Sequence, residues 1–284
     1  ASLGDEHPDL CVENLFGDYY THSLCPSHPD VREYAAALLT DICEELRPDS
    51  VMIESIGPRP AGTGPFGAIA NVGITTAVRW LWSLCFCPDC MSRAAELMRG
   101  LEPQALREKA KKLGLRLLNS ELGGRENEDA LAAMLMLEEP ELLRYQEARQ
   151  LMLAEFIGEI SEQLCQRGAE SRIIPSAVPF DINKVYLEGL SFSAAEGKAG
   201  MWMPLVYGPG ETYGMVRNTI RLFDSQTSVG MAATLLREAD RDSFCATLLT
   251  ARASGCDTFF IYNYSLASQE RLSWVAKFNE ALLA

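Results

Sequence analysis

Three cysteines fall within six residues of one another in the segment Leu84-Cys85-Phe86-Cys87-Pro88-Asp89-Cys90, and a fourth, Cys25, stands far earlier in the chain. Four thiolates are the number that a closed tetrahedral zinc site requires, and thiolates select zinc or iron–sulfur groups over hard cations. A closed shell of four sulfurs leaves no position for water, so such an ion is structural. The spacing therefore predicts that Cys25, Cys85, Cys87 and Cys90 bind a structural Zn²⁺ ion.

Two alternatives to an all-cysteine site stay open from the sequence. Free cysteine is among the most buried residue types, so some of these thiols can be ordinary core side chains. His22 and His28 flank Cys25, and either imidazole can replace a thiolate in a zinc shell. The other cysteines are isolated in mostly apolar patterns, and we expect them to pack in the core: Cys11, Cys43, Cys165, Cys245 and Cys256.

The composition is that of a folded, acidic protein. With 284 residues, 48% of them hydrophobic, the chain can bury a large core as one α/β domain or two smaller ones. A net charge of -14 and an isoelectric point near 4.7 repel nucleic acid and anionic membranes, so we expect neither as a partner. The composition is compatible with a homo-oligomer.

Cysteine usage and hydropathy bear on the compartment. Nine cysteines are an odd number, and their clustering indicates a metal site rather than a disulfide framework, which favours a reducing, cytoplasmic environment. No run reaches the roughly 18 apolar residues that a membrane span needs. No basic segment followed by an apolar stretch opens the chain, although a start at Ala1 is also compatible with a removed export signal.

The first half of the chain predicts mainly helices. Residues 1–25 show little periodicity, and Asn14–Tyr20 is expected to form a loop, whereas the capping sequence Ser27–Asp30 starts a helix that Pro48 stops. Val51–Ile56 has the length and apolar character of a strand. The remaining segments up to Gly168 are a long loop with a short helix at 57–83 and helices at about 92–112, 126–137 and 139–167.

The second half predicts alternating strands and helices. The strands are apolar with little alternation, which is typical of parallel strands buried on both faces. We expect strands at 171–178, 200–207, 227–235 and 258–262, and helices or short helical segments at 187–196, 213–223, 240–253 and 269–283.

These five strands, each followed by helical sequence, predict an α/β fold. We expect a (β/α)8 TIM-barrel-like domain over residues 1–284 that lacks the first strands in this chain and carries a zinc loop and helical insertion at about 57–168. An open five-stranded sheet of Rossmann-like order is the competing geometry, but no G-x-G-x-x-G motif follows any of the expected strands.

The motifs resemble a known family of enzymes. The block His22–Tyr34, then Glu54 near a strand end, then Cys85–Cys90 resembles in order and character the catalytic barrel of family 42 glycoside hydrolases. Uncharacterised relatives of that family look closer still, because they also share a block like Glu13–Asp18. The resemblance is specific over about residues 1–95 and architectural beyond. It implies that the same four cysteines bind zinc.

The resemblance also implies a glycosidase that hydrolyses O-glycosyl bonds of a carbohydrate. It assigns the general acid/base to Glu54, at the end of a strand, and the nucleophile to Glu238, although Ile53 stands where the family has asparagine. Glycoside hydrolysis needs two carboxylates, about 5 Å apart for retention or about 6.5–9.5 Å apart for inversion. From the residues alone, a carboxylate in an apolar strand is functional or is paired, here with Arg59 or Arg79.

Aromatic and polar residues follow two of the late strands. Tyr207 and Glu211 follow one, and Tyr262 and Asn263 follow the last. Sugars pack their C–H faces on aromatic rings and hydrogen-bond through their hydroxyls, so these four are candidate substrate-binding residues; half-buried packing is the alternative for the tyrosines. Glu188 is a further candidate carboxylate.

The competing function is a non-catalytic carbohydrate-binding or scaffold protein that has lost the second carboxylate. Geometry distinguishes the two functions. A second carboxylate about 5–10 Å from Glu54 in an open cleft favours hydrolysis, whereas hydrophobic or basic side chains around Glu54 favour binding.

Overall fold

The computed structural model describes residues 2–61, 74–119, 128–174, 182–206, 228–236, 240–262 and 264–283. The chain opens with a short helix and a 3-10 turn, followed by an antiparallel hairpin. These elements are α1 (Leu3–Glu6), η1 (Pro8–Leu10), β1 (Cys11–Glu13) and β2 (Tyr19–Leu24).

The hairpin turn is built by Asn14. Its side-chain oxygen accepts hydrogen bonds from the backbone N–H groups of Phe16, Gly17 and Asp18, and Gly17 has a positive φ of 98°. Asparagine favours such local turns, and glycine adopts a positive φ without steric cost. The loop expected at Asn14–Tyr20 is the turn of this hairpin as far as Asp18, whereas Tyr19 and Tyr20 already belong to β2. The two flanking strands were not expected, because they are too short to show a period.

The long helix α2 (Pro29–Leu46) begins one residue later than the capping sequence suggested. His28, not Ser27, is the N-cap residue: its Nδ1 accepts a hydrogen bond from the Asp30 N–H at 3.2 Å. Ser27 instead turns inward, with its hydroxyl 3.3 Å from Cys90 Sγ. The helix ends at Leu46, and Arg47 adopts the left-handed conformation that commonly terminates helices.

Two open parallel sheets follow the hairpin. The first has the order β3 (Ser50–Glu54), β4 (Glu170–Ile174), β5 (Met201–Trp202), and the second has the order β6 (Leu205–Val206), β7 (Met231–Thr234), β8 (Phe259–Tyr262). A bridge between Trp202 and Val229 links them. Pro204, which has no N–H to donate, falls in the interruption between β5 and β6.

The predicted TIM barrel is wrong. A closed barrel needs eight parallel strands, whereas the described residues form only sheets of two or three strands, one of them antiparallel. β3 and β8 each pair on one side only in the described part of the chain, so the sheets stay open. All five expected strand segments do contain parallel strands, but several are only two to five residues long and do not close on one another.

The helical part also departs from one expectation. The helix expected at 92–112 is two helices, because Gly100 takes a positive φ of 77° and Pro103 starts the next helix.

None of the helices in the described segments is long and apolar enough to cross a membrane. The helix expected at 213–223 lies outside the described residues. The helices are α3 (Thr76–Ser83), α4 (Pro88–Leu97), α5 (Pro103–Leu118), α6 (Glu128–Glu138), α7 (Pro140–Gln166), α9 (Arg241–Ala253) and α10 (Gln269–Leu283), with 3-10 turns η2 (Ile182–Glu188) and η3 (Tyr264–Leu266).

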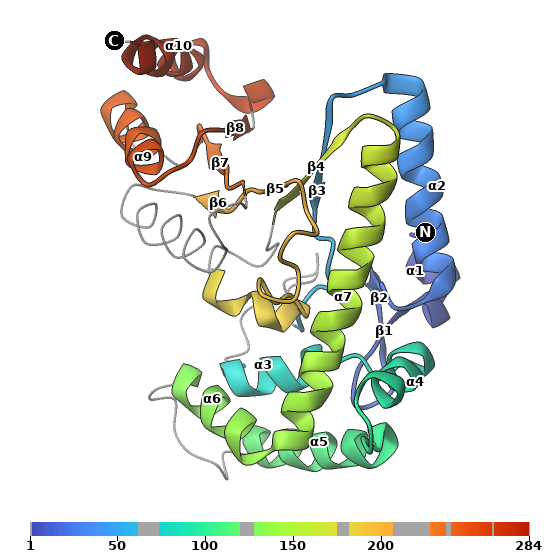
Figure 1. Ribbon diagram of the computed structural model, residues 1–284. Coiled ribbons are helices and arrows are strands. Elements are labelled where there is room, and N and C mark those ends of the chain that lie inside the picture. The colour runs from blue at the N-terminus through green and yellow to red at the C-terminus, as the bar shows by residue number, and fades with distance from the viewer. Residues whose placement is uncertain are drawn as a thin grey trace.

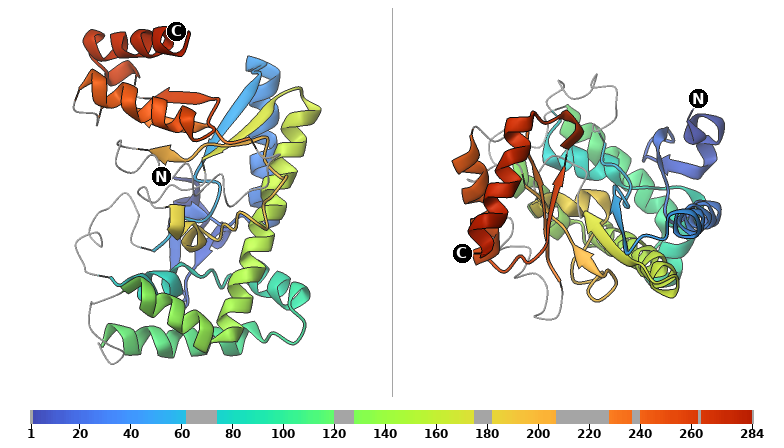
Figure 2. Two further views of the ribbon diagram at one scale, coloured as in Figure 1. Left: turned by 60° about the vertical axis from the view of Figure 1, so that its left-hand side comes forward. Right: turned by 90° about the horizontal axis from the view of Figure 1, so that it is seen from above.

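The helix α7 contributes to two hydrophobic cores. In Figure 1 it runs from the helical layer of α3, α5 and α6 to the strands. Its first half contributes Leu142 and Met152 to the core of that helical layer. Its second half contributes Ile157 and Leu164 to a second core, which also includes residues of the sheets, α9 and α10. Seen from above, the strands lie between the α2–α7 pair and the α9–α10 pair (Figure 2).

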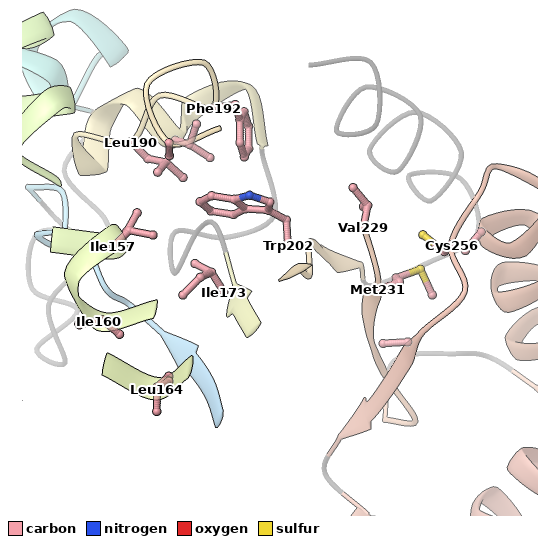
Figure 3. Packing of buried hydrophobic residues seen from close by; sticks show 14 of the residues in the cluster. Ile157, Ile160, Leu164, Ile173, Leu190, Phe192, Trp202, Val229, Met231 and Cys256 are labelled. Atoms are coloured by element: carbon pink, nitrogen blue, oxygen red, sulfur yellow. The ribbon is translucent and has the colours of Figure 1, made fainter. Parts of the chain in front are cut away.

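The sheet-side core is centred on Trp202, which is fully buried. Figure 3 shows its indole between Ile173 of β4 and Phe192, with Ile157 of α7 to the left of the indole. The rings of Phe192 and Trp202 meet edge to face, with centroids 5.6 Å apart. This core fixes α7 against β4 and thereby sets the position of the first half of α7, which reaches the cysteines.

Candidate metal centre and neighbouring pocket

The four predicted cysteines meet in space. The Sγ atoms of Cys25, Cys85, Cys87 and Cys90 all lie within 4.8 Å of one another, and all four side chains are buried. Cys25 Sγ is 3.5 Å from Cys90 Sγ, 3.6 Å from Cys87 Sγ and 3.8 Å from Cys85 Sγ. The prediction that these residues form one site that can bind a metal ion is therefore confirmed at the level of geometry.

The hairpin delivers the first ligand and holds the segment that carries the others. Cys25 directly follows β2, and its N–H donates to the carbonyl of Leu10 at 2.8 Å. On the other side, the N–H of Phe86, between two of the ligands, donates to the carbonyl of Glu13 at the end of β1 at 2.7 Å. Main-chain hydrogen bonds thus join two segments that are far apart in sequence.

The first turn of α4 supplies the last two ligands. Cys87 is the N-cap residue, and its Sγ accepts a hydrogen bond from the N–H of Cys90 at 3.5 Å. Pro88 follows at the first helical position, where its missing N–H costs nothing. Because the N-terminus of a helix carries a partial positive charge, it offsets part of the negative charge that these two ligands carry as metal-bound thiolates.

Tyr145 of α7 supports the cysteine segment from the opposite side. Its hydroxyl donates to the carbonyl of Cys85 at 2.5 Å, and its ring stacks on Phe86 with centroids 4.9 Å apart. Burial raises the pKa of Tyr145 well above its usual value, so the hydroxyl keeps its proton and stays a donor.

The thiols influence one another's protonation. Hydrogen bonds from Cys25, Cys87 and Cys90 hold the pKa of Cys85 well below its usual value. The pKa values of Cys87 and Cys90 are raised, first through their hydrogen bonds with Cys25. A cation that binds four thiolates must therefore displace protons from Cys87 and Cys90.

Both flanking histidines have other partners. His28 caps α2 through Nδ1, and its Nε2 lies 3.8 Å from Asp89. The ring of His22 stacks on Tyr20 with centroids 5.9 Å apart. Because four sulfurs already complete a tetrahedral set, the geometry does not favour a histidine ligand.

The remaining cysteines divide between core and surface. Cys11, Cys43 and Cys256 are buried, and the half-buried Cys245 packs against the sheet-side core, as expected. Cys165 is exposed, against expectation. All nine cysteines of the chain are free thiols in the structure.

A pocket of about 410 Å³ lies beside the metal centre and contains Glu54. Glu54 stands at the carboxyl end of β3 with its side chain exposed, and His22, Tyr34 and Arg59 also line the pocket. The next residue, Ser55, has a positive φ of 61°, an uncommon conformation for a non-glycine residue that turns the chain sharply after the carboxylate.

The loop after Glu54 is tied to the segments that carry the cysteines. The N–H of Arg59 donates to Ser23 Oγ, and the N–H of Ala61 donates to Ser83 Oγ, both at 2.9 Å. Ser23 and Ser83 each stand two residues before a cysteine ligand. The loop after Glu54, in which Arg59 lines the pocket, is thus hydrogen-bonded to residues next to two of the cysteines.

The other predicted site residues do not gather around Glu54 in the described structure. Tyr262 is half-buried on β8, in the other parallel sheet, and stacks on Phe260 with centroids 6.2 Å apart. Glu188 is buried and lines a small cavity beside the cysteines. Four predicted residues lie outside the described residues: Tyr207, Glu211, Glu238 and Asn263.

The alternative that Glu54 forms a salt bridge finds no support among the described residues. Arg79 Nη1 donates to the carbonyl of Ala61 at 3.0 Å, and Arg59 lines the pocket with Glu54 without an ion pair to it within the described part of the chain.

One residue beside the cysteines was missed from the sequence. Arg149 of α7 is 5% exposed and lines the same small cavity as Cys25, Cys85 and Cys90. The signal was present, because Arg149 falls in the buried stripe of α7 four residues after Tyr145. An ionised side chain in such a stripe is rare unless it is paired.

We expect Tyr145→Phe to lower the free energy of unfolding by about 1–3 kcal/mol, because it leaves the buried carbonyl of Cys85 without this donor while keeping the ring stack. Urea denaturation of the wild type and the variant measures the difference. Tyr264→Phe, at a side chain that is 71% exposed, is the matched control and should change stability by less than about 0.5 kcal/mol. Equal losses in the two variants would contradict a supporting role for Tyr145.

Comparison with known proteins adds no family to these observations. No protein-family model matches the chain, and no curated protein matches it. The resemblance to family 42 glycoside hydrolases stays a prediction that rests on the motifs quoted above.

Proposed function

We propose that the chain binds one structural zinc ion through Cys25, Cys85, Cys87 and Cys90. The observation that supports this proposal is the distance between the sulfur atoms. Zinc–thiolate bonds of about 2.3 Å in a tetrahedron place neighbouring sulfurs about 3.8 Å apart. The three Sγ separations from Cys25, at 3.5–3.8 Å, are close to that value before any metal is added.

The same separations disfavour an iron–sulfur cluster. In a cluster with several iron atoms the cysteines bind different metals and spread more widely than around a single ion. Sulfurs that all lie within 4.8 Å of one another favour one metal. A single iron ion has the same ligand preference, and metal analysis distinguishes it from zinc.

Four protein ligands close the coordination shell, so the ion acts through structure. It joins the hairpin, the α3–α4 connection and the start of α4, and the loop after Glu54 is hydrogen-bonded to the first two. Binding energies of structural zinc sites are on the order of 10 kcal/mol in small domains, comparable to the whole stability of a typical protein.

We expect Cys87→Ser to abolish stoichiometric zinc binding and to lower the melting temperature markedly, because it removes one of the four ligands, whereas the serine hydroxyl can still cap α4. Metal analysis of reduced, freshly purified protein and thermal denaturation measure both. Cys165→Ser, at an exposed thiol, is the control and should keep zinc and stability. Wild-type protein with less than one metal ion per chain would argue against the site.

We propose that the pocket at Glu54 binds a carbohydrate. Its lining combines apolar and aromatic side chains, including Tyr34 and Phe156, with the polar groups of His22, Glu54 and Arg59. Aromatic faces beside a few convergent polar groups are typical of sites for sugars and other polar ligands. Glu54 is the one carboxylate among the described residues that line the pocket, which favours binding over hydrolysis.

Glycoside hydrolysis is the second proposal. It rests on the resemblance and on the position of Glu54 at the carboxyl end of a parallel strand, where ligand sites of open α/β sheets lie. Glu54 would act as general acid/base, and Glu238, outside the described residues, is the proposed nucleophile. The hydrolase requires a second carboxylate at one of the two separations given above.

The free thiols bear on the environment of the protein. Nine unpaired cysteines, several of them clustered, suit a reducing compartment, and we propose the cytoplasm. The acidic charge continues to argue against nucleic acid and anionic membrane surfaces as partners.

We expect Glu54→Gln to weaken carbohydrate binding at least about 10-fold, because a charge-assisted hydrogen bond to a sugar hydroxyl is lost. Calorimetric titration with a panel of aryl glycosides and free sugars measures binding, and chromophore release from the same aryl glycosides measures hydrolysis. Glu33→Gln, on the exposed face of α2 outside the pocket, is the control.

The outcomes separate the two functions. Wild-type binding without chromophore release supports the binding function, and release that Glu54→Gln abolishes supports the hydrolase. A wild type that neither binds nor cleaves any sugar of the panel contradicts both.

A further inference from the structure

Arg149 is a buried, permanently charged side chain beside the cysteines. Guanidinium keeps its proton at all physiological pH values, so 5% exposure means that a full positive charge has left water. Moving an ionised group out of water is strongly unfavourable unless a negative charge or several hydrogen bonds compensate. The fold therefore requires a compensating partner.

The hydrogen bonds of Arg149 are incomplete in the described structure. Its Nη1 donates to Gln146 Oε1 at 3.1 Å, and Gln146 is fixed in turn by a hydrogen bond to the carbonyl of Tyr186 at 2.7 Å. Its buried Nη2 has no hydrogen-bond partner among the described residues. This nitrogen lies beside Gly189, at an ordinary van der Waals distance of 3.6 Å from the place that a Cβ atom would take there.

The cavity that Arg149 lines identifies the anions in its surroundings. Cys25, Cys85 and Cys90 line it from one side, and Glu188 also contributes to it. At about 10 Å³ it has no room for a separate anionic ligand such as phosphate, and holds at most one water molecule. The compensating charge must therefore come from the protein or from its metal centre.

A zinc ion with four thiolates is a dianion. The partial charge of the α4 N-terminus offsets only part of it, because a helix terminus carries about half an elementary charge. We propose that Arg149 is the buried counter-charge of the metal–thiolate centre, a positioning residue that raises metal affinity without ligating the metal. This inference rests on the proposed zinc site and adds to it the residue that balances its charge.

The experiment measures zinc affinity by competition with a chromophoric chelator, using reduced full-length protein. Arg149→Gln should bind zinc about 10–100-fold more weakly than the wild type, as is usual when a residue that supports a metal site from outside its ligand shell is removed. Arg149→Lys, which keeps the charge, should recover part of the loss. Cobalt substitution gives a second readout, because the sulfur-to-metal charge-transfer bands report the charge around the thiolates even in a less stable variant.

Glu188→Gln distinguishes the rival explanation, in which Arg149 serves only to neutralise Glu188. If Arg149 balances the metal centre, Glu188→Gln keeps or strengthens zinc binding, and the double variant stays weak. Wild-type affinity in Arg149→Gln, or wild-type affinity in the double variant, overturns the inference. A wild type that binds no metal at all is a different result, because it removes the zinc site itself.

Discussion

The meeting of four cysteine sulfurs is the constraint on which the described structure around the pocket depends. The β1–β2 hairpin is too short to be stable alone, and the connection between α3 and α4 is a few residues of irregular chain. The proposed metal ion gives both segments a fixed position. The hydrogen bonds from Phe86 to Glu13 and from Cys25 to Leu10 then hold the two segments in register.

The helix α7 connects this centre to the rest of the fold. One half packs against the sheets through residues such as Ile157, and the other half presents Tyr145 and Arg149 to the cysteine segment. The pocket depends on both attachments, because Phe156 of α7 lines it and the loop after Glu54 is tied to residues next to the ligands. In the proposed account, the position of the pocket therefore depends on both the metal ion and α7.

The sequence predicted the parts of the structure that depend on local pattern. Thiol spacing predicted the cluster, and apolar runs such as Val51–Ile56 predicted the parallel strands. The prediction of a closed barrel failed because the number of strands in a sheet is set by contacts between segments that are distant in sequence. The periodicity of a single segment does not reveal that number. Arg149 was missed because a single charge in a helical stripe acquires its meaning only when the cysteines are seen beside it.

The central claim is that one metal ion sits among four sulfurs, and X-ray absorption at the metal edge tests it most directly. The account predicts a zinc edge with a single shell of four sulfur neighbours at about 2.3 Å. Nitrogen or oxygen atoms in the first shell, or a second metal within scattering distance, would contradict it.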